Sequence, residues 1–205
     1  HNYQNEEQPL EKVNTDLIKG EHKPLVRRQI NQETVNKFNY QIGKHNGKTV
    51  QIANYYDNHR NLVAQKLRYP DKSFQWIGDS KKAILFGQNL WRDGGKLVCI
   101  TEGEVDAMSL SSIQNNKWAV CSVKTGSQGA KKDLQQQLEW LEKFETIVLM
   151  FDNDDPGLKA AQECAKLFSP SKARIAQLPL KDANEMLVQG KTKELIDCMW
   201  GAKSY

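Results

Sequence analysis

Apolar runs of strand length alternate with amphipathic stretches through the second half of the chain. The apolar runs cover residues 97–101, 118–123, 146–151 and 173–179. Helical spacing fills the intervals and the end of the chain, at residues 104–114, 130–144, 157–168, 182–188 and 193–200. Continuous apolar runs of this length are typical of strands buried on both faces of a parallel sheet. The alternating order predicts an α/β domain over residues 96–190, with a four-stranded, largely parallel sheet flanked by helices.

The first 95 residues have a different pattern. Residues 49–56 and 61–69 have strand character and flank a polar turn, which predicts a β-hairpin. A short helix is expected just before it, with Asn31 as its N-cap. We therefore expect a small α+β subdomain over residues 25–95. Residues 1–24 are polar and aperiodic, so they are expected to form a linker or arm, and residues 191–205 a C-terminal helix and the start of a linker.

Acidic residues follow two of the predicted strands. Glu102 comes directly after the strand at 97–101, and Asp152 and Asp154 follow the strand at 146–151. Parallel sheets bind ligands at the carboxyl ends of their strands, so these acids are expected to converge on one metal-dependent site. Alternation places Asp152 and Asp154 on the same side of an extended segment, while Asp155 begins the next helix. A single acid at a strand end is more often a helix cap, but two clusters on one scaffold favour a metal site.

Positive charge is concentrated beside this acidic region. The net charge is +4, and residues 60–92 contain seven basic residues against two acidic ones. Lys66 and Arg68 share one face of their predicted strand because side chains alternate, and Lys72 and Lys81 follow in the same segment. This pattern predicts a cationic stripe for a polyanion such as nucleic acid. The alternative is a solvated basic face.

Composition narrows the class of protein. Four cysteines are far apart and form no Cys-x-x-Cys pair, which predicts reduced thiols and no zinc site: Cys99, Cys121, Cys164 and Cys198. No apolar run approaches the roughly 20 residues of a membrane helix, and the N-terminus lacks a signal-peptide core. A cytoplasmic protein without a membrane partner is therefore expected.

Two groups of motifs resemble known families. Glu102-Gly-Glu-x-Asp-Ala107, followed by Asp152-x-Asp154 and Gly157, resembles the Toprim domain, the catalytic fold of primases, type IA and II topoisomerases and some nucleases. Further motifs resemble the primase half of T-odd phage primase–helicases and their mitochondrial relatives: Gln65-Lys-x-Arg68, Leu85-Phe-Gly87, Lys181-Asp-Ala-Asn-Glu185 and Met199-Trp200. This resemblance covers roughly residues 25–200.

The resemblance implies a DNA primase catalytic core. Such an enzyme copies single-stranded DNA into short RNA primers from ribonucleoside triphosphates, by metal-dependent nucleotidyl transfer. Glu102, Asp152 and Asp154 would be catalytic and would hold Mg²⁺ or Mn²⁺. Asp182 would hold a second metal, or would act only as an N-cap paired with Glu185.

The resemblance also implies partners. Lys66 and Arg68, supported by Lys72 and Lys81, would bind the phosphates of nucleotide or template. Related proteins carry a zinc-binding module before this region and a hexameric helicase after it, and neither motif occurs in this sequence. If the protein is phage-encoded, its expected location is the host cytoplasm.

Two alternatives remain open. One is a Toprim nuclease or topoisomerase fragment, although a topoisomerase needs a tyrosine nucleophile on a further domain. The other is a non-catalytic single-stranded DNA-binding module of a replicative helicase, which the intact acids disfavour. Residues 126–129 are expected to form a glycine loop at the rim of the active site, and they do not match a Walker A motif.

Overall fold

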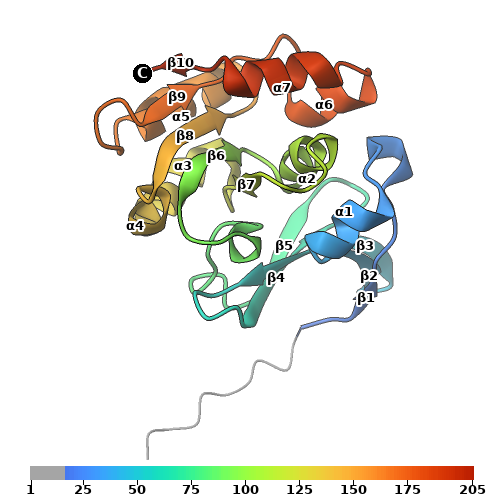
Figure 1. Cartoon of the computed structure of the whole chain (residues 1–205). Coiled ribbons are helices and arrows are strands. Elements are labelled where there is room, and N and C mark those ends of the chain that lie inside the picture. Colours follow the sequence, from blue (N-terminus) through green and yellow to red (C-terminus); the bar gives the residue numbers. More distant parts are fainter. Residues whose placement is uncertain (1–16) are drawn as a thin grey trace, which may run out of the picture.

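The computed structural model describes residues 17–205, which form two sheets packed one above the other (Figure 1). The first sheet is antiparallel throughout, in the order β1-β2-β3-β4-β5. Its strands are β1 Gly20–Glu21, β2 Tyr40–His45, β3 Lys48–Tyr56, β4 Leu62–Arg68 and β5 Phe74–Gly78. The predicted hairpin is confirmed as β3 and β4. The predicted helix is α1 (Gln32–Lys37), and the Asn31 side chain accepts a hydrogen bond of 2.9 Å from the Thr34 N–H.

The predicted N-terminal arm differs from the structure where it can be compared. Residues 1–16 lie outside the described residues, but β1 pairs with β2 within the remainder. The Ile18 N–H also donates to Gln65 Oε1 (2.8 Å), and the Ile18 carbonyl accepts from Gln65 Nε2 (2.9 Å). A buried amide requires such partners, so residues 17–21 are held against the sheet.

The second sheet contains the four predicted parallel strands. These are β6 Gly95–Thr101, β7 Ala119–Ser122, β8 Phe144–Met150 and β9 Ala173–Ile175. Their order is β9-β8-β6-β7, and all three pairings are parallel, which confirms the α/β prediction. A short antiparallel strand, β10 (Lys203–Ser204), adds to β9. The last residues therefore return to the sheet and do not leave it as the expected linker. A two-residue strand is too short to have a recognisable periodicity.

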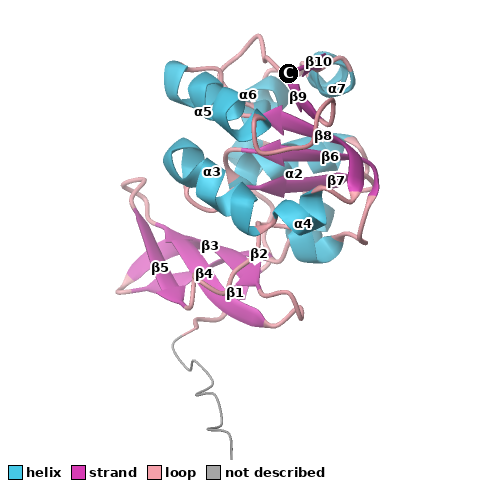
Figure 2. Ribbon diagram, turned by 90° about the vertical axis from the view of Figure 1, so that its left-hand side faces the viewer, coloured by secondary structure: helices cyan, strands magenta, loops and turns pink. Residues whose placement is uncertain are grey.

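Helices cover both faces of the parallel sheet (Figure 2). The helix α2 (Glu104–Ile113) contacts α6 (Ala183–Val188) and α7 (Thr192–Trp200), and α3 (Gly126–Gln136) contacts α5 (Asp155–Ala165). The predicted helix at 130–144 is instead α3 followed by the short α4 (Leu138–Leu141), and β8 starts at Phe144. None of the helices between residues 17 and 205 is long and apolar enough to cross a membrane.

The segment 126–129, predicted as a glycine loop at the rim of the site, is helical instead, although Gly126 does line the cleft described below. It forms the first turn of α3. Asp133 from the next turn accepts hydrogen bonds from the N–H groups of Lys124 (2.8 Å) and Thr125 (3.2 Å). These bonds anchor the start of the helix, so the glycines do not break it.

The two sheets share one hydrophobic core. Tyr55 and Ala64 of the antiparallel sheet belong to the same buried cluster as Val98 and Ile100 of β6. Leu67 lies on the opposite face of β4, in a small separate cluster. Because side chains alternate along β4, Lys66 and Arg68 project from the face that looks toward the parallel sheet.

Candidate functional site

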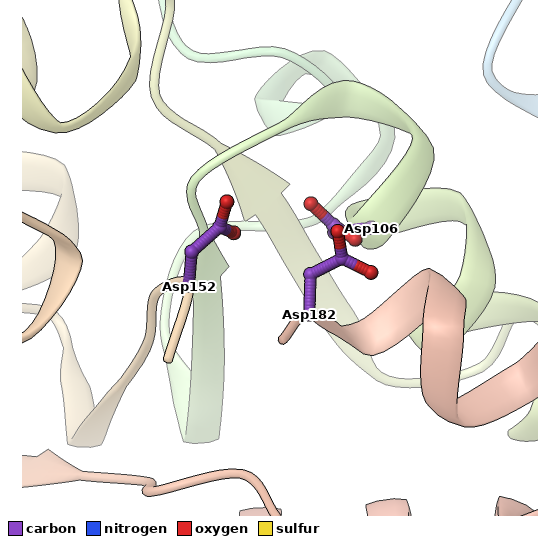
Figure 3. A group of neighbouring side chains, drawn as sticks. All are labelled: Asp106, Asp152 and Asp182. Carbon is purple, nitrogen blue, oxygen red and sulfur yellow. The ribbon is translucent and has the colours of Figure 1, made fainter. Parts of the chain in front are cut away.

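Three aspartates converge at the edge of the parallel sheet (Figure 3). Asp106, Asp152 and Asp182 each offer a carboxylate oxygen, and these oxygens lie within 4.8 Å of one another. We call these three residues the acidic cluster. Asp106 lies in the first turn of α2, Asp152 follows β8, and Asp182 follows β9 and precedes α6. Because β6, β8 and β9 are adjacent and parallel, their carboxyl ends bring these segments together.

Backbone hydrogen bonds fix two of the three carboxylates. Asp106 Oδ1 accepts from the Asn184 N–H (3.0 Å), which belongs to the first turn of α6. Asp182 is the N-cap of α6, and its Oδ1 accepts from the Glu185 N–H (2.8 Å). The start of α6 therefore orients both aspartates. Its N-terminal dipole also stabilises the negative charge of the two carboxylates.

Gly157 shapes the loop that carries Asp152. A Cβ atom at position 157 would lie 2.2 Å from the Asp152 carbonyl oxygen, so only glycine fits there. The Gly157 N–H donates to Asp154 Oδ1 (2.8 Å), which makes Asp154 the N-cap of α5. As predicted, Asp155 begins this helix, with Pro156 in its first turn.

Burial and mutual repulsion disfavour the ionised forms of two aspartates in the acidic cluster. Burial raises the pKa of Asp152 to about 7, with further contributions from the charges of Glu102 and Asp182. Burial, followed by the charges of Asp182 and Asp152, also raises the pKa of Asp106 well above its usual range. A divalent cation would reverse both effects because it favours the ionised carboxylates. Mg²⁺ binds oxygen at about 2.0–2.1 Å, so two ligand oxygens on one ion lie at most about 4.2 Å apart, and carboxylates within 4.8 Å of one another need to close only slightly around it.

Four acids were predicted as metal ligands, and only some of them belong to the acidic cluster. Of the four, Asp152 and Asp182 belong to it. Glu102 lies beside it, with Oε1 3.4 Å from the Asp152 nitrogen, and burial raises the pKa of Glu102. Asp154 uses one carboxylate oxygen to cap α5. Sequence reasoning missed Asp106, although it lies in the quoted motif, because an acid in a first helical turn is also an ordinary partner of the helix dipole.

Basic side chains line the same cleft as the acids, a cleft of about 1010 Å³ that we call the central cleft. Lys66 and Arg68, predicted to act together, both line it, and so does Lys72. The full set, which we call the cationic wall, is Arg27, Arg28, Lys66, Arg68, Lys72, Lys124 and Lys181. Lys81 instead lines an adjoining recess of about 470 Å³.

Two members of the cationic wall make contacts that the sequence pattern did not reveal. Lys66 Nζ forms an ion pair with Glu104 Oε1 (2.9 Å) and donates to the Lys124 carbonyl (2.9 Å). Arg28 Nη1 donates to Asn184 Oδ1 (3.2 Å), so Arg28 contacts the same residue that orients Asp106. Asn184 thus connects Arg28 of the cationic wall to Asp106 of the acidic cluster.

Lys124 and the two arginines were not predicted as site residues. Lys124 Nζ donates to the Ser80 and Ala83 carbonyls (3.2 and 3.0 Å), and burial lowers its pKa. Arg27 and Arg28 belong to a short 3₁₀ helix that lies far from the other site residues in sequence. The adjacent pair of arginines was the only local signal for that segment.

Comparison with known proteins identifies relatives among phage helicase/primases. The family described as bacteriophage T7 DNA helicase/primase, N-terminal a+b fold, matches residues 20–78, and the Toprim-like family matches residues 99–187. The DNA helicase/primase of Enterobacteria phage T3 is 39% identical over 186 residues, which are 91% of this chain and 33% of that protein. The chain thus spans about a third of the length of this curated relative.

Solved structures extend the likeness. The primase fragment of the bacteriophage T7 primase-helicase protein is 40% identical with a TM-score of 0.83, covering 88% of this chain and 75% of that one. A second match comes from a structure of bacteriophage T7 lagging-strand DNA polymerase interacting with primase domains bound to an RNA/DNA hybrid and dTTP. It is 39% identical with a TM-score of 0.86, covering 91% of this chain and 94% of that one.

Proposed function

This chain belongs to the family of the bacteriophage T7 helicase/primases, and we propose that it is a DNA primase catalytic core. It copies a single-stranded DNA template into short RNA primers from ribonucleoside triphosphates. The observation that carries this proposal is the central cleft, which is lined by both the acidic cluster and the cationic wall. Nucleotidyl transfer requires both features, because the reacting groups are phosphates and their charge must be neutralised.

The acidic cluster is suited to Mg²⁺ or Mn²⁺. Its ligands are all carboxylate oxygens, which these hard cations prefer, and none is the sulfur or imidazole nitrogen typical of zinc sites. A bound divalent ion supplies neutralisation of phosphate charge and activation of the attacking hydroxyl. We propose Asp106, Asp152 and Asp182 as ligands. We propose that Glu102 and Asp154, the other predicted catalytic acids, complete the site, since the charges of both act on Asp152.

The basic residues of the central cleft bind and orient the substrates. Arg68 and Lys72 contact phosphate groups of the template or of the incoming nucleotide, and Arg27 and Arg28, which line the same cleft, do so as well. Lys81 contributes only from the adjoining recess. Lys66 is held by Glu104, so it acts mainly by fixing the geometry of the cationic wall.

The wider assembly is also part of the proposal. The T3 relative is named a helicase as well as a primase, and this chain spans about a third of it. We propose that the full-length protein joins this core to a hexameric helicase and to a zinc-binding module, and that it works on phage DNA in the host cytoplasm.

The decisive experiment is incubation with labelled ribonucleotides, a single-stranded template and Mg²⁺ or Mn²⁺, scored for RNA product and for template cleavage. A primase yields RNA and leaves the template intact. Cleavage without RNA would support the Toprim nuclease alternative, and template binding with neither product would support a non-catalytic module. Asp152→Asn serves as the inactive control, and Asp93→Asn, whose carboxylate is exposed and pairs with Lys143, is the matched acid outside the central cleft.

A further inference from the structure

Two aromatic residues of β5 lie beside two cations of β4 on the inner face of the antiparallel sheet. In the register between β4 and β5, Lys66 lies opposite Trp76 and Arg68 lies opposite Phe74. All four side chains line the central cleft. The cationic wall therefore includes aromatic surface as well as charge.

The two aromatic residues differ in how far their side chains are buried. Trp76 is partly buried and packs against Tyr55, with ring centroids 4.8 Å apart. Phe74 is 53% exposed, although it belongs to a strand and faces the cleft. A large apolar side chain left this open gains little stability from burial, so its exposed surface is available to a ligand.

Cations hold the Phe74 ring in place. Lys66 Nζ lies 4.7 Å from the ring centroid and Arg68 Cζ lies 5.7 Å from it, both within the range of cation–π contacts. Lys66 is itself fixed by Glu104 and by the Lys124 carbonyl. The ring therefore loses little conformational freedom when a ligand stacks on it.

We propose that Phe74 is a base-stacking platform of the central cleft. A nucleobase stacks on the exposed ring surface while the adjoining phosphates pair with Arg68 and Lys72. The base can belong to the template strand or to the incoming nucleotide, since both present the same flat π-surface. A positively charged groove combined with aromatic side chains is the arrangement by which proteins hold single strands without reading their sequence. The identity of the copied polymer rests on the proposed function, but stacking on Phe74 does not require catalysis.

The first test measures binding without chemistry. A labelled oligodeoxythymidylate is titrated by fluorescence anisotropy, in EDTA and without nucleotide, against the wild type, Phe74→Ala, Phe74→Trp and Phe74→Leu. Loss of one stacking platform weakens binding about tenfold in Phe74→Ala, while Phe74→Trp retains affinity. Phe74→Leu keeps an apolar side chain but loses the π-face, so it does not restore binding. Tyr205→Ala is the matched control because Tyr205 is 54% exposed and lies outside the cleft, and its affinity stays within twofold of wild type.

The second test asks whether the base is the partner of the ring. The same titrations use a strand of equal length made of abasic sites, which keeps the phosphates and removes the bases. Wild type loses affinity for this strand, and Phe74→Ala causes no additional loss on it. An equal loss on both strands would show that the substitution disturbs the cationic wall, and it would overturn the proposal. Unchanged binding of oligodeoxythymidylate and of ATP by Phe74→Ala would overturn it as well.

A third titration with ATP distinguishes the two sources of the base. A loss confined to ATP places the incoming nucleotide on Phe74, and a loss confined to the oligonucleotide places the template there. The proposal and the primase assignment can fail separately. If Phe74→Ala weakens binding only where bases are present but no RNA is made, the stacking proposal stands and the primase assignment fails. If RNA is made but Phe74→Ala has no base-dependent effect on binding, the primase assignment stands and the stacking proposal fails.

Discussion

Lys66 Nζ lies 2.9 Å from Glu104 Oε1, and this ion pair joins β4 of the antiparallel sheet to the first residue of α2. The same carboxylate oxygen accepts a hydrogen bond from the Tyr55 hydroxyl (2.7 Å). Two residues further along α2 is Asp106 of the acidic cluster. The residue that the sequence suggested as a free phosphate contact is therefore also a structural link between the two halves of the site.

Removing this link should destabilise the fold. Both side chains are nearly buried, with 11% of Lys66 and 10% of Glu104 exposed. Lys66→Ala leaves Glu104 without its counter-ion, so we expect a loss of about 3 kcal/mol in the free energy of unfolding. Urea denaturation measures it. Lys143→Ala, which breaks the exposed pair with Asp93, should cost less than about 1 kcal/mol. Similar losses for the two variants would contradict the structural role.

The acidic cluster makes a prediction that distinguishes it from the sequence-derived set. Asp106→Asn should reduce nucleotide joining about 100-fold or more, as should Asp152→Asn, because each removes a proposed metal ligand. Calorimetric titration with Mg²⁺ or Mn²⁺ should show a parallel loss of affinity. Glu163→Gln, an exposed acid on α5, serves as the control and keeps both properties. Full activity of either Asp→Asn variant would remove that residue from the site.

Metal-free stability should depend on pH through Asp152. Its folded-state pKa of about 7 exceeds the ordinary value of 3.8, so the folded state binds the proton more tightly. The stabilisation is complete below pH 3.8 and is lost as pH rises through 7. In EDTA, Tm should therefore rise as pH is lowered from about 8 to about 5.5, and less so in Asp152→Asn. If the Tm of Asp152→Asn depended on pH as steeply as that of wild type, the pH dependence would come from other groups.

Asp152→Asn should also raise the metal-free Tm at about pH 8, by a few degrees, because it removes like-charge repulsion. Excess Mg²⁺ should cancel this advantage, since wild type then gains a ligand for its ionised carboxylates. Thermal melts with and without Mg²⁺ provide the comparison. A variant that is less stable than wild type in EDTA would show that Asp152 contributes more through its contacts than it costs through charge.

Gly157 provides a test of loop geometry that changes no charge. Gly157→Ala places a Cβ 2.2 Å from the Asp152 carbonyl oxygen, so the loop between β8 and α5 must move. We expect a loss of roughly 1–3 kcal/mol in stability and weaker binding of Mg²⁺. Lys159→Ala, at an exposed position two residues along α5, should alter neither. Unchanged Mg²⁺ affinity in Gly157→Ala would separate the loop from the metal site.

The cationic wall should show a graded dependence on salt. Arg68→Ala and Lys72→Ala should each weaken oligonucleotide binding at low salt and reduce the salt slope by about one phosphate contact. Lys81→Ala should have a smaller effect because Lys81 lines the adjoining recess. Binding measured across a salt series checks this order. Equal effects at all three positions would indicate a diffuse basic face.

Local patterns were sufficient to predict the architecture. Apolar runs and helical spacing depend only on neighbouring residues, so the four parallel strands and the hairpin of β3 and β4 could be predicted without tertiary information. The carboxyl ends of parallel strands meet, which is why Glu102 and Asp152 could be expected to lie near each other, whereas Asp182 was suggested only by the family resemblance. The motifs alone were also sufficient to suggest the family.

Tertiary structure decided which side chains are free. An acid in the first turn of α2 can point to solvent or to a site, and the contact between Asp106 and the Asn184 N–H determines which. The surroundings of Lys66 and Phe74 likewise depend on what lies opposite their strands. Glu104 forms an ion pair with Lys66, whereas the Phe74 ring borders the cleft and stays exposed. Trp118, at the start of a predicted strand, and Trp200, at the end of a predicted helix, are 40% and 38% exposed. Periodicity identifies the face of an element on which a side chain lies, but only the packing of distant segments determines whether that face is covered.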